Sequence, residues 1–237
     1  MTNQQFLFKQ NTQPLADRMR PQALDDFVGQ EHIVGAGTML RTMIQNNTLS
    51  SCIFWGPPGT GKTSLARVIA HTTNRRFFAH NAVFSGIKDI KEIIEQAESL
   101  INSGEQSVIL FIDEIHRFNK AQQDAFLNPI ERGTIILIGA TTENPSFEIN
   151  AALLSRCTVY TLALLEDAHI KQIVSRALTD AENGLGAQHP QLEPTALDLL
   201  INYANGDARV AINTLEAAVI NTHEQNDVRL LTPDIIK

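Results

Sequence analysis

The sequence has few cysteines, no long apolar run and no excess of basic residues. Cys52 and Cys157 are its two cysteines among 237 residues. Two are too few for a disulfide framework or a cysteine-built zinc site, so we expect buried thiols. No stretch approaches the roughly 20 apolar residues that cross a bilayer, and the polar first residues do not resemble a signal peptide. We therefore expect a cytoplasmic protein without a membrane partner.

Acidic residues outnumber basic ones. The chain has 19 Lys and Arg against 26 Asp and Glu, which gives a formal net charge of −7 at pH 7. This balance argues against a broadly basic surface for nucleic acid. It leaves open a few basic groups gathered in the pore of a ring of subunits. Composition alone therefore does not predict a DNA partner.

Short apolar runs alternate with helical patterns after residue 50, which is typical of a parallel sheet with crossover helices. The expected strands are residues 52–55, 77–83, 108–113, 135–140 and 159–162. Strand signals stop at about Glu166, and amphipathic helical patterns follow. We predict an α/β domain over residues 1–165, of which residues 1–50 form an irregular N-terminal linker segment. A small all-helical domain is predicted over residues 166–237.

A glycine-rich segment follows the first expected strand and leads into a helical pattern. It consists of Gly56, Pro57, Pro58, Gly59, Thr60, Gly61, Lys62, Thr63 and Ser64. Glycines let backbone N–H groups converge on phosphates, and the helix N-terminus adds free donors. In such a phosphate loop, Lys62 neutralises the β- and γ-phosphates of ATP and the Thr63 hydroxyl binds Mg²⁺. A chance glycine turn would not match so many positions between a strand and a helix.

Two carboxylates end the apolar run 108–112. A fully apolar strand is central in a parallel sheet, so its carboxyl end lies beside the phosphate loop. Asp113 is expected to hold the Mg²⁺ shell and Glu114 to polarise the attacking water. The pair favours hydrolysis, because a metabolic kinase would need a substrate lid and acceptor-binding arginines. Trp55 and His116 are expected to be packing and hydrogen-bonding residues rather than catalytic ones.

These motifs together resemble the AAA+ ATPases, whose P-loop parallel-sheet ATPase domain is followed by a small helical lid. Within that class the chain resembles the RarA/MgsA group of replication-associated recombination ATPases, whose eukaryotic relatives are the Werner-helicase-interacting ATPases. Four stretches carry this resemblance: 14–21 (PLADRMRP), 116–126 (HRFNKAQQDAF), 139–148 (GATTENPSFE) and 153–156 (LLSR). Clamp-loader subunits and the RuvB branch-migration motor are the nearest cousins.

The resemblance implies roles for further residues. Asn81 resembles the polar partner that restrains the catalytic glutamate. Thr142, expected to end the fourth strand, resembles the sensor of the water or γ-phosphate, with Asn144 as the alternative. Arg156 resembles an arginine finger that reaches the neighbouring subunit's nucleotide, and Arg209 the lid sensor of its own. The predicted adenine side consists of Arg18, Pro21, Val28, Gly29 and Gln30. For each arginine the simpler alternative is a solvated or surface-paired side chain.

The implied function is hydrolysis of MgATP in replication-fork maintenance, recombination and DNA repair, in a bacterial, nucleoid-associated protein. DNA forks, gaps or ends, single-strand-binding protein and recombinase are the implied partners, and the full-length form is expected to be a homo-oligomer. The group's C-terminal oligomerisation module would begin where this chain stops, so we expect a fragment. Two alternatives stay open. One is a clamp-loader subunit or RuvB-like DNA motor, and the other is an ATP-binding switch or scaffold with little hydrolysis.

Overall fold

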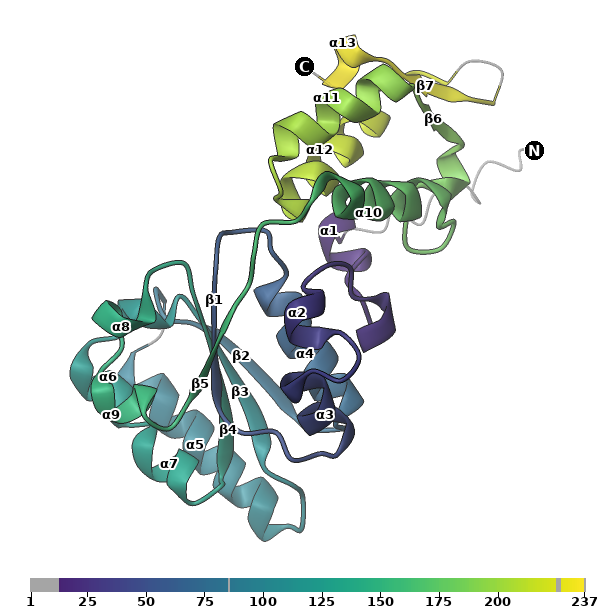
Figure 1. Cartoon of the computed structure of the whole chain (residues 1–237). Helices are drawn as coiled ribbons and strands as arrows, with labels where there is room; N and C mark the ends of the chain where they lie inside the picture. Colours follow the sequence, from purple (N-terminus) through teal and green to yellow (C-terminus); the bar gives the residue numbers. More distant parts are fainter. Residues whose placement is uncertain (1–12, 85, 225–226, 237) are drawn as a thin grey trace. The chain divides into compact units, whose positions relative to one another are not determined.

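The computed structural model describes residues 13–84, 86–224 and 227–236, which form two compact units. One unit covers residues 21–164. The other combines residues 13–20 with the chain from Leu165 onward (Figure 1). The predicted α/β domain includes residues 13–20, but in the structure these residues belong to the C-terminal unit. In the described parts of the chain, no helix is long and apolar enough to span a membrane.

The first unit is built on a five-stranded parallel sheet with the strand order β2-β3-β4-β1-β5. The strands are β1 (Cys52–Trp55), β2 (Phe77–Asn81), β3 (Val108–Asp113), β4 (Ile135–Thr141) and β5 (Thr158–Thr161). This arrangement confirms the predicted α/β class. The expected second strand ran to residue 83, but β2 ends at Asn81. The chain turns there, because Val83 N donates to the Asn81 side chain at 2.9 Å.

Helices cover both faces of this sheet (Figure 1). One face packs against η1 (Leu24–Asp26), α2 (Glu31–Val34), α3 (Met39–Gln45) and α4 (Lys62–Thr72). The other carries α5 (Ile87–Asn102), η2 (Ile115–Arg117), α6 (Lys120–Asp124), α7 (Leu127–Glu131), α8 (Pro145–Glu148) and α9 (Ala151–Leu154). Successive strand residues point to opposite faces, so Phe54 lies in the first core and Ile53 in the second. Every residue of β4 is buried, as a central parallel strand requires.

The second unit is helical, as predicted, and has a core of its own. Its helices are α1 (Leu15–Arg18), α10 (Asp167–Thr179), η3 (Gly186–Gln188), α11 (Pro194–Ala204), α12 (Ala208–Asn221) and α13 (Pro233–Ile236). It also contains two short parallel strands, β6 (Pro190–Leu192) and β7 (Arg229–Leu231). The sequence shows no strand signal after Glu166. Three residues are too few to show an alternating pattern, so neither β6 nor β7 could be predicted.

Both thiols lie where β1 pairs with β5. Cys52 lies buried in β1, opposite Thr158, and Cys157 lies half-buried just before β5. Burial, and secondarily the charge of the neighbouring thiol, raises the pKa of Cys52; burial raises the pKa of Cys157 to about 12. Both therefore stay protonated near neutral pH and are poor nucleophiles. The prediction of buried thiols is confirmed for Cys52, whereas Cys157 keeps some exposure.

Gly139 in β4 makes room for the isoleucines beneath the carboxylate motif. A Cβ at Gly139 would lie 2.7 Å from Ile53 Cδ1 and 2.9 Å from Ile115 Cδ1, and both isoleucines are fully buried. We expect Gly139→Ala to lower the free energy of unfolding by about 1–3 kcal/mol through overpacking. Denaturant titration followed by circular dichroism measures this change.

The matched control for that variant is Gly86→Ala. The added Cβ would meet only Asp89 Oδ2, at an ordinary 3.7 Å. Because Gly86 is the N-cap of α5, where alanine is less favourable than glycine, this variant should lose at most about 1 kcal/mol of stability, less than Gly139→Ala. A Gly139→Ala protein as stable as the parent would show that the core accommodates the extra methyl group.

Candidate functional site

The phosphate loop and the two carboxylates meet at the carboxyl edge of the sheet. β1 leads directly into residues 56–61, which end at the N-terminus of α4, and β3 ends at Asp113. β4 lies between β1 and β3 and pairs with both. The two motifs are therefore about two strand spacings, or 10 Å, apart. Open α/β sheets bind ligands at this edge.

Two glycines shape the phosphate loop, because a side chain at either position would not fit. Gly61 has a φ of +98°, and a Cβ there would lie 2.8 Å from Phe27 Cζ. A Cβ at Gly56 would lie 2.2 Å from the carbonyl oxygen of Leu162. Both positions thus exclude any other residue, through close approach and, at Gly61, also through a left-handed backbone. The resulting cradle before α4 fits a phosphate chain, which backbone N–H groups and the helix N-terminus would bind.

Lys62 is folded onto this loop. Its Nζ donates to the carbonyl oxygens of Gly56 and Pro57, both at 2.8 Å, and the residue is buried. The Thr60 hydroxyl donates to the same Pro57 carbonyl at 2.9 Å. The ammonium group therefore already lies inside the loop that would hold the phosphates. Ser64 is part-buried in the first turn of α4.

Two side chains carry oxygen atoms that could bind a magnesium ion, with phosphate and water as its remaining ligands. Thr63 lies in the first turn of α4, and Asp113 lies at the end of β3. Mg²⁺ prefers oxygen ligands and is usually bound by one or two protein groups together with phosphates and water. Within the described ranges, no group of three or more His, Cys, Asp and Glu side chains could hold a metal. The donor set fits a nucleotide-bound ion rather than an all-protein metal centre.

Glu114 makes a sharp turn directly after β3. Its φ of 54° and ψ of 41° are left-handed, a conformation that costs about 1–2 kcal/mol for a non-glycine residue. Its side chain is 32% exposed, and Oε2 lies 3.4 Å from His116 Nδ1. The same nitrogen lies 2.9 Å from the hydroxyl oxygen of Thr141. The structure therefore supports the expected hydrogen-bonding role of His116.

Asn81 lies beside the carboxylate motif. At the end of β2 it is in register with Asp113, and Ala82 N donates to the Asp113 carbonyl at 2.9 Å. The Asn81 side-chain oxygen accepts from Val83 N. This bond belongs to the turn after β2, so the predicted restraint of Glu114 by Asn81 remains a prediction.

The two sensor candidates follow β4. The strand ends at Thr141, so the expectation that Thr142 ends it is wrong by one residue. Thr142 lies part-buried just beyond the strand. The Asn144 side chain accepts from Ser146 N at 3.0 Å and caps α8. Both residues are at the same sheet edge as the loop, and their sensor roles remain predictions.

Gln30, predicted to lie near adenine, bridges two backbone segments. Its Nε2 donates to the carbonyl oxygens of Ala163, at 2.7 Å, and Thr60, at 3.4 Å, while its Oε1 accepts from Ala163 N at 2.9 Å. The residue is buried. Its amide thus ties the phosphate loop to the segment after β5. The predicted neighbours Pro21, Val28 and Gly29 belong to the same compact unit.

Arg18 lies in the other unit. Its Nη1 donates to the carbonyl oxygens of Asn183, at 2.8 Å, and Gly184, at 3.3 Å, and its Nη2 lies 3.7 Å from Glu216 Oε1. These bonds attach α1 to the helical unit. The predicted proximity of Arg18 to adenine therefore stays a prediction.

The two further arginines differ in their contacts. Arg156, after α9, donates from Nε to Glu131 Oε1 at 2.8 Å, from Nη2 to the same oxygen, and from Nη1 to the Ala152 carbonyl at 2.7 Å. Both partners are exposed, so the pair contributes about 0–1 kcal/mol and is easily exchanged. Arg209 lies in the first turn of α12, where Asp207 caps the helix. No bond joins its exposed guanidinium to another described residue.

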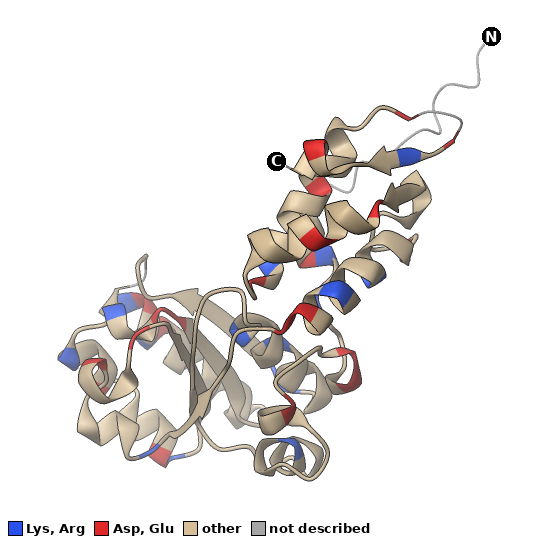
Figure 2. Ribbon diagram, turned by 45° about the horizontal axis from the view of Figure 1, so that its top comes forward, with Lys and Arg blue, Asp and Glu red and all other residues tan. Residues whose placement is uncertain are grey.

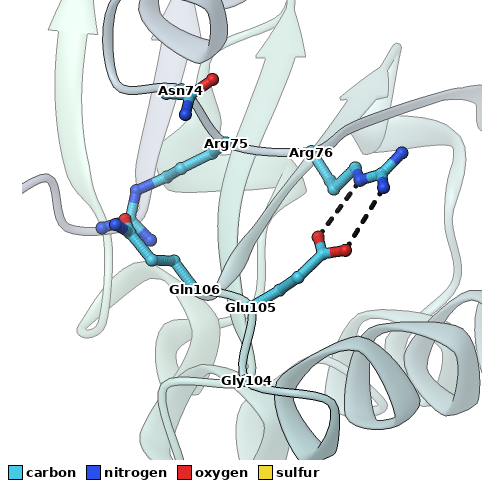
Figure 3. A pocket seen from close by; sticks show the side chains of 6 residues that line it. All are labelled: Asn74, Arg75, Arg76, Gly104, Glu105 and Gln106. Atoms are coloured by element: carbon cyan, nitrogen blue, oxygen red, sulfur yellow. Dashed lines mark hydrogen bonds and ion pairs between the residues drawn. The ribbon is translucent and has the colours of Figure 1, made fainter.

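A surface pocket of about 480 Å³ lies at the opposite edge of the sheet (Figure 3). Two loops line it, one before β2 and one before β3: Asn74, Arg75, Arg76, Gly104, Glu105 and Gln106. Hydrogen bonds and the charge of Glu105 raise the pKa of Arg76, while burial lowers the pKa of Arg75. Arg75 also donates to the Ser107 carbonyl at 2.9 Å. The lining cations are paired within the protein, and the pocket lies away from the strand ends that carry the motifs.

Comparison with known proteins agrees with this geometry. Residues 52–163 match the family of ATPases associated with various cellular activities (AAA). These residues form an AAA ATPase domain. Over its whole length it is 48% identical to Replication-associated recombination protein A of Haemophilus influenzae and to that of Escherichia coli. It is 46% identical, over 92% of its length, to ATPase WRNIP1 of Dictyostelium discoideum. These matches confirm the resemblance to the RarA/MgsA group.

The chain covers only part of these relatives. It spans about half of each Replication-associated recombination protein A, 53%, and 25% of ATPase WRNIP1. Among solved structures, it is similar to the RuvB Holliday junction branch migration motor of Thermotoga maritima, with a TM-score of 0.69 and 26% identity. That match covers 92% of this chain and 71% of RuvB. The AAA ATPase domain implies ATP binding.

Lys62→Ala tests the loop as the phosphate site. Removing the ammonium group should abolish measurable MgATP binding, because the phosphates lose the cation that lies inside the loop. Isothermal titration calorimetry with a slowly hydrolysed ATP analogue measures the affinity. The control is Lys171→Ala, at an exposed lysine of α10. ATP affinity near the parent value in a stable Lys62→Ala protein would contradict the assignment.

Proposed function

We propose that the chain hydrolyses MgATP, with Glu114 polarising the attacking water. The observation that supports this best is a pair of carboxylates at the end of β3, beside the glycine-shaped cradle after β1. The Glu114 side chain is partly exposed and can meet water. A carboxylate in reach of both water and the γ-phosphate can act as a general base.

Each residue of the loop edge would do one part of the reaction. Lys62 would exchange its two carbonyl partners for β- and γ-phosphate oxygens, while Thr63 and Asp113 would hold Mg²⁺, which neutralises phosphate charge when it is bound. Glu114 would take a proton from water as the water oxygen bonds to the γ-phosphorus and the bond to ADP breaks. Thr142, with Asn144 as the alternative, would orient the water or the γ-phosphate.

Two arginines would complete the site. We propose that Arg156 leaves Glu131 and stabilises the γ-phosphate held by a neighbouring copy of the protein. The ion pair of Arg156 with Glu131 is exposed and therefore weak, which supports such an exchange of partners. Arg209, whose guanidinium no described residue binds, would contact the nucleotide of its own chain.

We also propose a role in replication-associated recombination, with DNA forks, gaps or ends as the substrate. The 48% identity to Replication-associated recombination protein A supports it. Single-strand-binding protein and recombinase would be partners, and the active form would be a homo-oligomer. A RuvB-like branch-migration motor is the second candidate, favoured by the TM-score of 0.69. ATPase stimulation by forked DNA rather than by four-way junctions would favour the first role.

Glu114→Gln separates binding from hydrolysis. The amide keeps the size of the side chain but cannot accept a proton, so turnover should fall by about 10²-fold or more while ATP binding persists. Phosphate release measures turnover, and calorimetry measures binding. The matched control is Glu143→Gln, a nearby exposed carboxylate. If Glu114→Gln turns over ATP at the parent rate, another residue activates the water.

Arg156→Ala tests the exchange between copies. Arginine fingers supplied in trans accelerate related reactions by about 10³–10⁵-fold, so hydrolysis should fall strongly while ATP affinity stays within a few-fold. The parent's specific activity should rise with protein concentration. Arg132→Ala, at an exposed arginine beside Glu131, is the control. Mixing Arg156→Ala with Lys62→Ala protein should restore some activity, and full activity in a dilute monomer would refute the exchange.

A further inference from the structure

We propose that His116 is a positioning residue that orients the Glu114 carboxylate and joins it to the turn after β4. This inference rests on the proposed role of Glu114 as the group that polarises water. It adds to that role a buried side chain which belongs to neither of the two sequence motifs. His116 lies in η2, three residues beyond Asp113.

The hydrogen-bond geometry assigns the proton of the ring. His116 Nδ1 lies 2.9 Å from Thr141 Oγ1 and 3.4 Å from Glu114 Oε2. A carboxylate can only accept, so a bond to Glu114 requires the proton on Nδ1. The tautomer is inferred from this network. In this tautomer Nδ1–H donates to Thr141 Oγ1, the nearer oxygen, and Glu114 Oε2 lies within ion-pair distance of the same nitrogen.

Thr141 is compatible with this assignment. Its Oγ1 accepts from Glu143 N at 3.0 Å and, in this tautomer, from the histidine ring. Its own proton faces the Glu143 carbonyl oxygen, 3.3 Å away. Each proton in this network thus has an acceptor. With its proton directed to the Glu143 carbonyl, the hydroxyl oxygen can accept from the ring.

Burial fixes the ring and leaves the carboxylate accessible. The His116 side chain is 7% exposed and Thr141 is fully buried, whereas the Glu114 side chain is 32% exposed. Hydrogen bonds shielded from water are stronger and rigidify the groups that make them. His116 contacts one oxygen of the carboxylate, Oε2, and leaves Oε1 for water. This arrangement suits a group that orients a base rather than one that replaces it.

The same ring reaches the segment that carries the sensor candidates. Thr142 follows Thr141 directly, and Asn144 begins α8 two residues later. A displacement of this turn would therefore change the position of the His116 partner, and with it the orientation of Glu114. His116 thus couples the base to the residues proposed to contact the γ-phosphate.

His116→Phe and His116→Asn form the test pair. Phenylalanine keeps a ring but removes the Nδ1 donor, so kcat for ATP should fall roughly 10–100-fold, as for other residues that orient a reacting group from behind. Nucleotide affinity should stay within a few-fold. Asparagine can place an amide N–H near the position of Nδ1 and should recover most of the lost kcat. Thr141→Val, with Thr141→Ser as its control, should lower kcat in the same direction.

The Glu114→Gln background distinguishes positioning from a structural role. If His116 acts through Glu114, adding His116→Phe to Glu114→Gln should cause no further loss of kcat. A parent-like kcat in His116→Phe, or an equal loss in both backgrounds, would overturn the inference. Parent-like activity in Glu114→Gln alone would instead refute the proposed function. Thermal unfolding of each variant shows whether it folds, and Thr141→Val keeps the test valid if His116→Phe does not.

Discussion

The pairing of β4 with β1 on one side and β3 on the other is the constraint on which the site depends. Because all of β4 is buried, a one-residue slip would present the wrong side chains to both close-packed cores, which disfavours other registers. That register holds the end of β3 two strand spacings from the phosphate loop. Gly139 adds a second constraint, since its missing side chain lets Ile115 approach β4. The residue after Ile115 can then reach Thr141, so the same strand that separates the two motifs also links them.

Buried side chains fix the geometry of this site, whereas more exposed side chains are available to react. Gln30, His116 and Thr141 are largely buried and bonded to neighbouring segments, and their hydrogen bonds gain strength from the exclusion of water. Glu114 is partly exposed beside the buried His116 ring, whereas Arg156 bonds to the exposed Glu131 and to the Ala152 carbonyl. The surface pair of Arg156 is weak, so this side chain can change partners at little cost. A phosphate-hydrolysing site needs both properties, because the geometry must be fixed while charges move.

The sequence predicts what depends on neighbours along the chain. β1 and β3 have the expected bounds, since a run of apolar residues followed by glycine or carboxylate marks both ends of a buried strand. It does not predict contacts between distant residues. Gln30 meets Ala163 across 133 positions, and Arg156 meets Glu131 across 25. In the sequence, a polar residue beside Gly29 is equally compatible with an adenine contact. Only the fold shows that the Gln30 amide is hydrogen-bonded to Ala163 and Thr60. The bounds of β2, β4 and β5 differ from the expected ones by one or two residues, because turn hydrogen bonds decide where strands end.

The same fold is compatible with different functions. The chain is 48% identical to Replication-associated recombination protein A but only 26% identical to a RuvB motor whose fold it shares over 92% of its length. The overall fold therefore tolerates large changes of sequence, as expected when function lies in sites carried by a common fold. Lys and Arg are interspersed with Asp and Glu in both units (Figure 2), in line with the net charge of −7. In the proposed role on DNA, these two units would offer a few local basic groups, which several copies could place side by side.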